Sequence, residues 1–443
     1  MDKAPGHKTI GPAIAAIIDA FLDANADIED TIFNSIGADT SDPQTLSTLI
    51  EPLRGHIARG LSTNGRTPST AETATDDCTS TIRYELLEAW TRLARDPGHK
   101  LSSWIANGPP AGVAVDFDEL DGLYPRVQPG DQDSPEDLHT DYDTFVNYKG
   151  VDEDPDAAIV IDGYIAKNYL KVFSDLESVK RYVGGDPIVS KLGLVVKDKV
   201  NPTTGKITKK VRIILDNKQS GVTKSASRTH RSTLPRATHA IGGALSLMDK
   251  QGPKRKRAVR FLIADVSDAF WLIPLSKREL KYFVSKNRGR WLVFMRTAQG
   301  SRGAPLSWAA IAALVARCVQ SLFFTDDSCT ELDAKLQLYV DDPLLAMRGD
   351  DHHCKRLCVR FCVAWLVLGF NLAFSKAQCS PDVVWIGVRL KINERRIEAT
   401  IPAEKIKELL ELIASILSRN MIPLKELRTF AGKAMNIAVL IVI

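Results

Sequence analysis

The sequence predicts an α+β protein with an acidic, mainly helical first part, residues 1–160, and a basic second part, residues 161–443, in which helices and short strands mix. Charge is the first observation behind this prediction. Residues 1–160 carry 11 Lys and Arg against 29 Asp and Glu, whereas the rest of the chain carries 47 against 25. The second observation is periodicity, because apolar residues recur at helical spacing in the first part and in short strand-length runs in the second. With 443 residues, of which 44% are hydrophobic, the composition is that of a globular protein of about two to four domains.

The acidic part divides into a helical segment and a linker. Residues 1–104 contain apolar clusters at helical spacing, and the pattern over 82–93 is amphipathic, so both predict helices. Residues 105–160 are dense in Pro, Gly and Asp, which predicts a loop or tether. We expect residues 1–104 to form a solvated accessory module. A structural or capsid-like role for it stays open, because no motif there carries chemistry.

The basic part contains strands that lead into polar loops. The runs 191–199 and 209–217 are β-rich and flank the turn sequence NPTTG, which predicts a hairpin. The run 260–275 begins as an apolar strand that ends at Asp265. Further patterns predict a strand, a long apolar helix and a strand–acidic turn–strand unit, at 289–297, 306–323 and 335–347 respectively.

Three aspartates are the candidate catalytic residues: Asp265 at its strand end, and Asp341 with Asp342 in the acidic turn. Adjacent carboxylates repel each other unless a cation neutralises them. Mg²⁺ takes carboxylate oxygens and substrate phosphates, and two such ions about 4 Å apart can activate a hydroxyl and stabilise a leaving pyrophosphate. An isolated Asp pair is usually an exposed turn, which is what we expect of residues 326–327. The pair at 341–342 differs because it lies between two strand-like runs.

Six ordered motifs over residues 185–435 resemble those of reverse transcriptases. ADVSDAFWLIPL, with Asp265, resembles the first catalytic motif, and YVDD, with Asp341 and Asp342, has the form of the third. VRIILDN, with Lys197 before it, resembles the fingers, and QGSRGAP resembles the second palm motif. GFNLAFSKAQ resembles the fourth motif, and WIGVRL resembles the primer-gripping hairpin. LRTFAGKAMNIA is similar to the thumb start of retrotransposons that encode a tyrosine recombinase. The chain is therefore identified as similar to the reverse transcriptases of retroelements.

The resemblance implies a right-hand polymerase fold, with fingers over 161–259, a palm over 260–390 and a partial thumb over 391–443. It implies an RNA-directed DNA polymerase that adds deoxynucleotides from their triphosphates to a primer 3′-hydroxyl. The implied partners are an RNA or DNA template with its primer. The implied cofactor is a pair of Mg²⁺ ions, or Mn²⁺, held by Asp265, Asp341 and Asp342.

The resemblance also assigns roles to single residues. Phe270 is implied to lie beneath the sugar, where a planar ring leaves no room for a ribose 2′-hydroxyl. Lys376 is implied as the general acid for the departing pyrophosphate. The implied nucleotide contacts further comprise Lys197, Arg212, Gln299 and Gly300, and the implied primer grip is Trp385 with Gly387. Taken singly, each of these residues has a more common meaning as a surface cation, a core aromatic residue or a loop glycine.

Two other functions stay open. An RNA-dependent RNA polymerase would need a small residue at the position of Phe270. The three intact aspartates argue against a degenerate remnant that binds nucleic acid without chemistry, but Pro343, which removes a strand N–H beside the aspartate pair, keeps this alternative open. Only 56 of the 443 residues follow Gly387. We therefore expect an incomplete thumb, weak processivity and no ribonuclease H domain.

The remaining features concern the compartment and the cysteines. No apolar run reaches the roughly 18 residues that span a bilayer, and no signal-peptide pattern opens the chain, so we expect an intracellular protein without a membrane partner. The seven cysteines are an odd number, which favours reduced thiols. Cys354, Cys358 and Cys362 share a helical face, with His352 and His353 nearby. We predict buried thiols there rather than a metal site. The oligomeric state is left open.

Overall fold

The computed structural model describes residues 6–38, 42–75, 78–128, 133–200, 207–248, 258–298, 300–325, 331–393 and 396–441. Helices and strands are mixed, as the sequence predicts. Three sequence features lie outside the described residues, namely the turn sequence NPTTG, Gln299 and the 326–327 aspartate pair.

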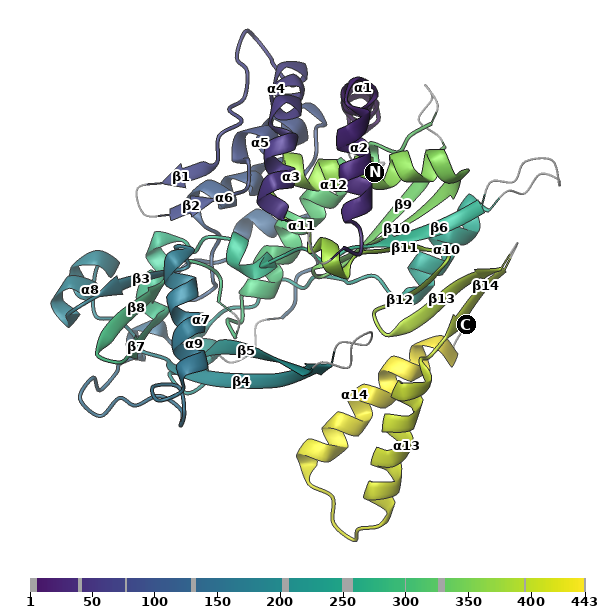
Figure 1. The fold of residues 1–443 in the computed structure, drawn as a ribbon. Coiled ribbons are helices and arrows are strands. Elements are labelled where there is room, and N and C mark those ends of the chain that lie inside the picture. Colours follow the sequence, from purple (N-terminus) through teal and green to yellow (C-terminus); the bar gives the residue numbers. More distant parts are fainter. Residues whose placement is uncertain are drawn as a thin grey trace.

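The elements follow the chain in the order given in Figure 1. The α-helices are α1 (His7–Ala24), α2 (Ala26–Ser35), α3 (Pro43–Leu49), α4 (Glu51–Gly60), α5 (Tyr84–Leu93), α6 (Trp104–Asn107), α7 (Pro155–Ala166), α8 (Leu176–Val183), α9 (Val222–Ser225), α10 (Ala237–Leu247), α11 (Ala304–Ser321), α12 (Asp351–Val367), α13 (Ala403–Leu417) and α14 (Leu424–Ile441). The strands are β1 (Thr73–Thr75), β2 (Cys78–Ser80), β3 (Leu170–Phe173), β4 (Lys191–Val200), β5 (Ile207–Asp216), β6 (Ala258–Ile263), β7 (Val284–Asn287), β8 (Arg290–Phe294), β9 (Ala334–Tyr339), β10 (Asp342–Gly349), β11 (Gln378–Ser380), β12 (Asp382–Trp385), β13 (Val388–Asn393) and β14 (Arg396–Thr400).

The central sheet has the strand order β11-β6-β10-β9, and its neighbours are antiparallel. Successive side chains of β10 alternate between two hydrophobic clusters. Leu345 and Met347 pack into the cluster that contains α11 and α12, whereas Leu344 and Ala346 pack into the cluster that contains α10 and β12. Both faces of β10 are therefore buried. That explains why its sequence reads LLAM, a continuous apolar run, rather than alternating with polar residues.

The predicted hairpin over 191–217 forms as β4 and β5, which pair over ten residues in register from Lys191↔Asp216 to Val200↔Ile207. Strands β3, β8 and β7 form a second small sheet. Together with α7 and α8 this sheet packs around a cluster of its own, which includes Ile161, Trp271 and Leu292. In Figure 1 this part lies on the left and the central sheet on the right.

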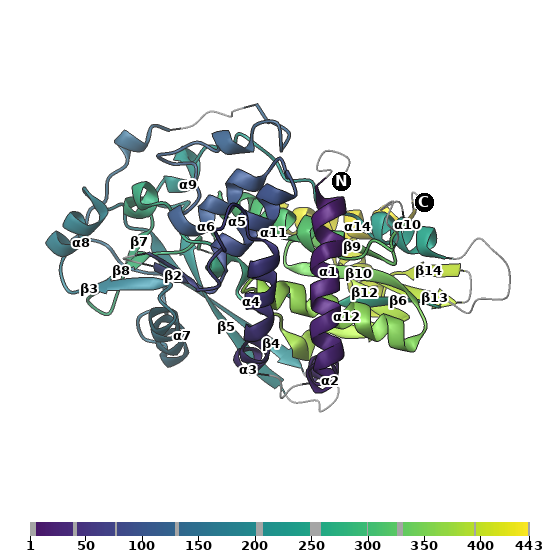
Figure 2. The ribbon, with the colours of Figure 1, turned by 90° about the horizontal axis from the view of Figure 1, so that it is seen from above.

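The N-terminal helices are not a separate module. Ile14, Ile18 and Leu22 of α1 belong to one hydrophobic cluster with Trp308 of α11 and Trp365 of α12. Their helical spacing places them on one face, and that face is buried against α11 and α12. Figure 2 shows α1 and α4 lying above these elements. The boundary suggested by charge near residue 160 is therefore not a boundary in the hydrophobic core.

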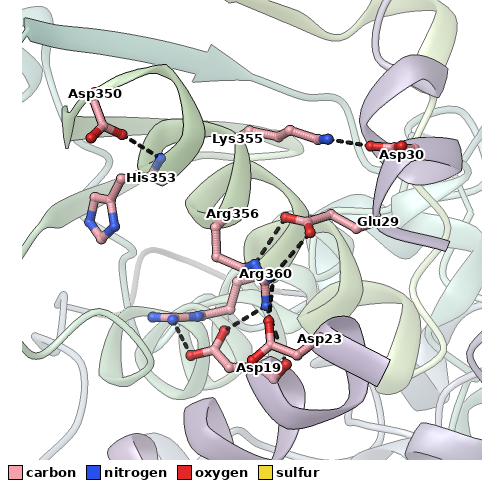
Figure 3. A network of polar contacts seen from close by, with 9 residues as sticks. All are labelled: Asp19, Asp23, Glu29, Asp30, Asp350, His353, Lys355, Arg356 and Arg360. Atoms are coloured by element: carbon pink, nitrogen blue, oxygen red, sulfur yellow. Dashed lines mark hydrogen bonds and ion pairs between the residues drawn. The ribbon is translucent and has the colours of Figure 1, made fainter. Parts of the chain in front are cut away.

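Part of the charge contrast is neutralised inside the fold, as Figure 3 shows. Arg356 of α12 makes a two-pronged ion pair with Glu29 of α2, with N–O distances of 2.9 and 3.0 Å, and a third contact of 2.8 Å with Asp23 of α1. Arg360 pairs with Asp19. The acidic helices thus cover a basic face of α12, in addition to covering its apolar face.

The stretch 105–160, predicted as a loop or tether, contains the end of α6 and the start of α7 at Pro155. Between these helices its described residues form no α-helix or strand, but parts of it are buried. Val113 is 7% exposed and Phe117 1% exposed. The carboxylate of Glu279, itself 0% exposed, accepts backbone hydrogen bonds of 3.0 to 3.3 Å from the N–H groups of Ala111, Val113, Ala114 and Val115. A buried backbone needs partners for its polar groups, and a single carboxylate supplies four. This loop is therefore part of the fold rather than a free tether.

Two further helical features stand out. Within the described ranges, α11 is the one single helix that is long and apolar enough to cross a membrane by length and composition, and 67% of that window is buried inside the protein. Helices α13 and α14 form an antiparallel pair that projects from the rest in Figure 1. Several large apolar side chains of this pair are exposed, among them Leu410 at 60% and Leu417 at 80%.

Candidate active site

The candidate site is a cleft of about 670 Å³ at the junction of the central sheet with β5 and α7. It brings together side chains that are far apart in the sequence. Those predicted from the sequence are Arg212, Asp265, Phe270, Asp341 and Lys376, and those not predicted include Tyr164, Lys167 and Asp268. Acidic and basic groups therefore share one cavity with an aromatic ring.

Backbone hydrogen bonds lock the two aspartate-bearing segments together. The N–H of Val266, next to Asp265, donates to the carbonyl of Asp341 at 2.8 Å, and the N–H of Ala264 donates to the carbonyl of Pro343 at 3.1 Å. The regular ladder between β6 and β10 begins at the next pair, Leu344↔Ile263. Pro343 thus lies at the end of this ladder, where a missing N–H costs little.

The aspartate turn is a two-residue hairpin turn closed by the pair Asp342↔Tyr339. Val340, its first residue, has φ +55°, a conformation that is uncommon for a β-branched residue and is held by surrounding contacts. Trp308 supplies one such contact, since its indole N–H donates to the Val340 carbonyl at 2.8 Å. Trp385 supplies another by donating to the Asp342 carbonyl at 3.0 Å.

The charge of Asp265 affects the pKa values of both Asp341 and Asp342. Burial, together with the charges of Asp341 and Asp265, raises the pKa of Asp342 to about 6. Burial and the charge of Asp265 also raise the pKa of Asp341, against the opposing effect of Lys376 and Arg212. The ammonium of Lys376 lies 2.7 Å from Oδ1 of Asp265. Burial is therefore the main cause of both pKa shifts, and the neighbouring carboxylate charges add to it.

The donor chemistry of this site fits Mg²⁺ or Mn²⁺, which prefer carboxylate oxygens. In the part of the chain that the structure describes, no three His, Cys, Asp or Glu side chains are gathered closely enough to hold a metal ion. The Lys376 ammonium instead takes up one oxygen of Asp265. Burial, and then the charges of Asp341 and Asp265, raise the pKa of Asp342, and a divalent cation bound there would favour its ionised form.

The nucleotide-binding candidates are only partly brought together. Arg212 lines the cleft, and its cross-strand partner is Val195. Lys197 pairs with Lys210 two positions along, so Lys197 and Arg212 lie on one face of the hairpin. Lys197 is exposed and does not line the cleft. Gly300 also lies outside it: its φ is +106°, and a Cβ there would clash with the Leu215 carbonyl, which explains the need for glycine.

The two primer-grip candidates differ in exposure. Trp385 is 1% exposed, and its ring packs edge-on against Tyr339. It therefore supports the aspartate turn from inside the protein. Gly387 lies in the β12–β13 turn with φ +83°, after Ile386 with φ +43°, and it is partly exposed.

The predicted burial of the three cysteines is confirmed. Cys354, Cys358 and Cys362 are 2%, 0% and 1% exposed, and they pack in the core between α12 and the sheet. Cys358 lies 3.4 Å from Cys379, sulfur to sulfur, and both are free thiols. His353 instead contacts Asp333 at 2.9 Å.

Sequence reasoning missed Lys167, Tyr169 and Asp268. Lys167 and Tyr169 follow α7, in a stretch with no motif of its own, and Asp268 lies inside the first motif without having been given a role. The one available signal was a second Asp three positions after Asp265.

Comparisons with known proteins give distant structural neighbours only. No protein family matches the sequence, and no curated protein matches it. The chain is similar to a foamy viral protease-reverse transcriptase in complex with double-stranded DNA, at 14% identity and a TM-score of 0.44, over 92% of this chain and 51% of that one. A complex of such a protein with an RNA/DNA hybrid matches at 14% identity and a TM-score of 0.42, over 92% and 39% of the two chains. Another double-stranded DNA complex matches at 17% and 0.43, over 76% and 58%. The chain thus spans about half the length of the first of these proteins.

Proposed function

We propose that this chain is a template-directed nucleotidyltransferase that synthesises DNA, as a reverse transcriptase does. The observation that carries the proposal is the cleft, which is lined by Asp265 and Asp341 together with Arg212, Lys376 and Phe270. Asp342 follows Asp341 directly at the start of β10. Carboxylates for divalent cations, cations for phosphates and a planar ring for a sugar are what transfer of a nucleotide requires.

Asp265, Asp341 and Asp342 are the residues that would hold two Mg²⁺ or Mn²⁺ ions. When bound, these ions activate the primer 3′-hydroxyl and stabilise the leaving pyrophosphate. Arg212 binds the phosphates of the incoming nucleotide by charge-assisted hydrogen bonds, and Lys197 extends the same basic face of the hairpin. Phe270 excludes a ribose 2′-hydroxyl.

Lys376 has two tasks in this proposal. In the structure its ammonium is 2.7 Å from Asp265, so it neutralises part of the carboxylate charge. Lys376 Nζ would also carry the proton that passes to a pyrophosphate oxygen as that group departs. Cations bound at the carboxylates would free Lys376 from Asp265 for this role.

The proposed partners are an RNA or DNA template with its primer, and deoxynucleoside triphosphates. Support for nucleic acid comes from the balance of 47 Lys and Arg against 25 Asp and Glu after residue 160, since neutralising phosphates releases counterions. We further propose that the chain acts inside a cell and is encoded by a retroelement.

A primer-extension assay on RNA and on DNA templates, with Mg²⁺ or Mn²⁺, tests the proposal. Asp265→Asn and Asp341→Asn are expected to abolish extension while template–primer affinity stays within a few fold, because the chemistry needs the ions and backbone binding does not. Asp116→Asn, at an exposed aspartate away from the cleft, is the matched control. Extension with ribonucleotides alone would identify an RNA polymerase. Tight binding without extension by the unaltered chain would identify a remnant that only binds nucleic acid.

A further inference from the structure

Two contacts from the α7–β3 segment fix Asp268, which begins the short 3-10 helix η4 (Ala269–Leu272) that carries Phe270. The ammonium of Lys167 lies 2.7 Å from Asp268 Oδ2, and the hydroxyl of Tyr169 donates to the same oxygen at 3.1 Å. Burial, followed by the charge of Asp268, raises the pKa of Tyr169, so its hydroxyl stays protonated and remains a donor.

Asp268 has a backbone that needs such support. Its φ is +54°, in the left-handed region, which a residue with a side chain occupies at a cost. Its carbonyl accepts the N–H groups of Trp271 at 2.7 Å and Leu272 at 3.2 Å, so this one residue starts η4. The contacts that hold Asp268 therefore also set the position and orientation of η4.

The same segment also holds the far side of η4. The ring of Tyr169 stacks on Trp271, with centroids 5.2 Å apart and planes 7° apart, and the ring of Tyr164 lies 4.5 Å from Trp271. Tyr169 thus contacts the residue that precedes η4, with its hydroxyl at Asp268, and a residue inside η4, with its ring at Trp271. Phe270 lies between these two points and lines the cleft.

We propose that Lys167 and Tyr169 are positioning residues which, through Asp268, hold η4 in place and so set how strictly Phe270 discriminates deoxyribonucleotides from ribonucleotides. This inference rests on the proposed nucleotidyl transfer and adds the residues that determine its sugar selectivity. Exclusion of a single hydroxyl depends on where a ring stands to within a fraction of an ångström. A looser η4 admits the ribose even though Phe270 is unchanged.

The test is the ratio of kcat/KM for a deoxynucleotide to kcat/KM for the matching ribonucleotide, measured on the full chain. Lys167→Met removes the ammonium and Tyr169→Phe removes the hydroxyl but keeps the stacked ring. Each is expected to lower the ratio by roughly three- to tenfold, the effect of losing one hydrogen bond. Lys167→Arg keeps a charged donor and is expected to restore most of the selectivity.

The matched control is Arg290→Met. It removes an ion pair of the same kind close to the same segment, because Arg290 of β8 lies 3.0 Å from Asp162 of α7, and neither residue lines the cleft. Its ratio is expected to equal that of the unaltered chain. A second check uses Phe270→Val. In that background Lys167→Met is expected to leave the ratio unchanged, since the ring through which it acts is gone.

The outcomes separate this inference from the proposed function. If the unaltered chain selects deoxynucleotides and both variants keep the ratio within about twofold, the positioning role is wrong and the polymerase stands. Equal losses of rate with both sugars, or a loss that persists in the Phe270→Val background, also overturn it, because they indicate general damage. If the unaltered chain incorporates neither sugar, the proposed function fails and the positioning role fails with it.

Discussion

Trp385 donates its indole N–H to the carbonyl of Asp342 at 3.0 Å and is 1% exposed. A residue that the sequence suggested for gripping a primer is thus placed behind one of the carboxylates. Trp308 contacts the same turn and donates its indole N–H to the carbonyl of Val340. The backbone of the aspartate turn is therefore held by two buried indoles, and the side chains of both aspartates depend on that support.

Trp385→Phe removes this hydrogen bond and keeps an aromatic ring. We expect kcat for primer extension to fall by roughly three- to tenfold, as for one lost hydrogen bond, with little change in the KM for nucleotide, because Trp385 is buried behind the turn. Steady-state kinetics at fixed template–primer measure both. A raised KM with an unchanged kcat would instead give Trp385 a role in binding.

The pKa of Asp342 predicts a pH-dependent stability in the absence of divalent ions. Its folded-state pKa of about 6 lies above the ordinary value of 3.8, so the ionised carboxylate is disfavoured in the fold. The contribution of Asp342 to the free energy of unfolding is therefore fully present below about pH 4, and it is lost as the pH rises through about 6. We expect Asp342→Asn to stabilise the metal-free protein by about 1 kcal/mol at pH 7.5, after allowing for solvent screening of this half-buried group.

Denaturant unfolding of both proteins at pH 4 and pH 7.5, with and without Mg²⁺, measures this effect. The gain should be absent at pH 4, and Mg²⁺ should stabilise the unaltered protein at pH 7.5 more than the variant. A gain that is the same at both pH values would show that the charge of Asp342 is not its cause.

Glu279 tests whether the 105–160 stretch is part of the fold. Glu279→Ala leaves four backbone N–H groups of the loop without their acceptor. We expect a loss of about 2 to 4 kcal/mol in the free energy of unfolding, since buried donors without partners are costly. Glu411→Ala, at an exposed helix position, is the control and should change stability by less than about 0.5 kcal/mol. Similar values for the two variants would mean that the loop is only loosely attached.

Arg356 tests the union of the acidic helices with α12. Arg356→Met leaves Glu29, whose side chain is 8% exposed, without its ion-pair partner. We expect a loss of about 2 to 4 kcal/mol, because an unpaired buried charge is destabilising. Lys355→Met is the matched control on the same helix. Its partner Asp30 is 60% exposed, so the loss should stay below about 1 kcal/mol.

Urea unfolding of both variants would measure these losses in the free energy of unfolding. Limited proteolysis of the Arg356 variant should show earlier cleavage within residues 6–38 than in the unaltered chain. Equal stability of the two variants would place the N-terminal helices outside the cooperative core, as the charge pattern first suggested.

The sequence by itself determined the local elements. The predicted strands at 191–199 and 209–217, the helix near 306–323 and the strand–turn–strand unit at 335–347 all form within a few residues of their predicted bounds. They could be predicted because apolar periodicity and turn residues act over a few positions. Motif order also nominated Asp265, Asp341 and Lys376, which the fold brings into one cleft. Their catalytic roles stay predictions.

Only the tertiary structure decided which faces are buried and against what. The charge contrast suggested a detached acidic module, yet Ile14 and Ile18 share a core with Trp365. An apolar helix face specifies that it will be buried but not its partner, since the hydrophobic effect has no direction. Trp385 and Lys167 acquired their places in the same way. Each depends on a contact with a residue far along the chain, Asp342 and Asp268 respectively, and only folding brings such residues to hydrogen-bonding distance.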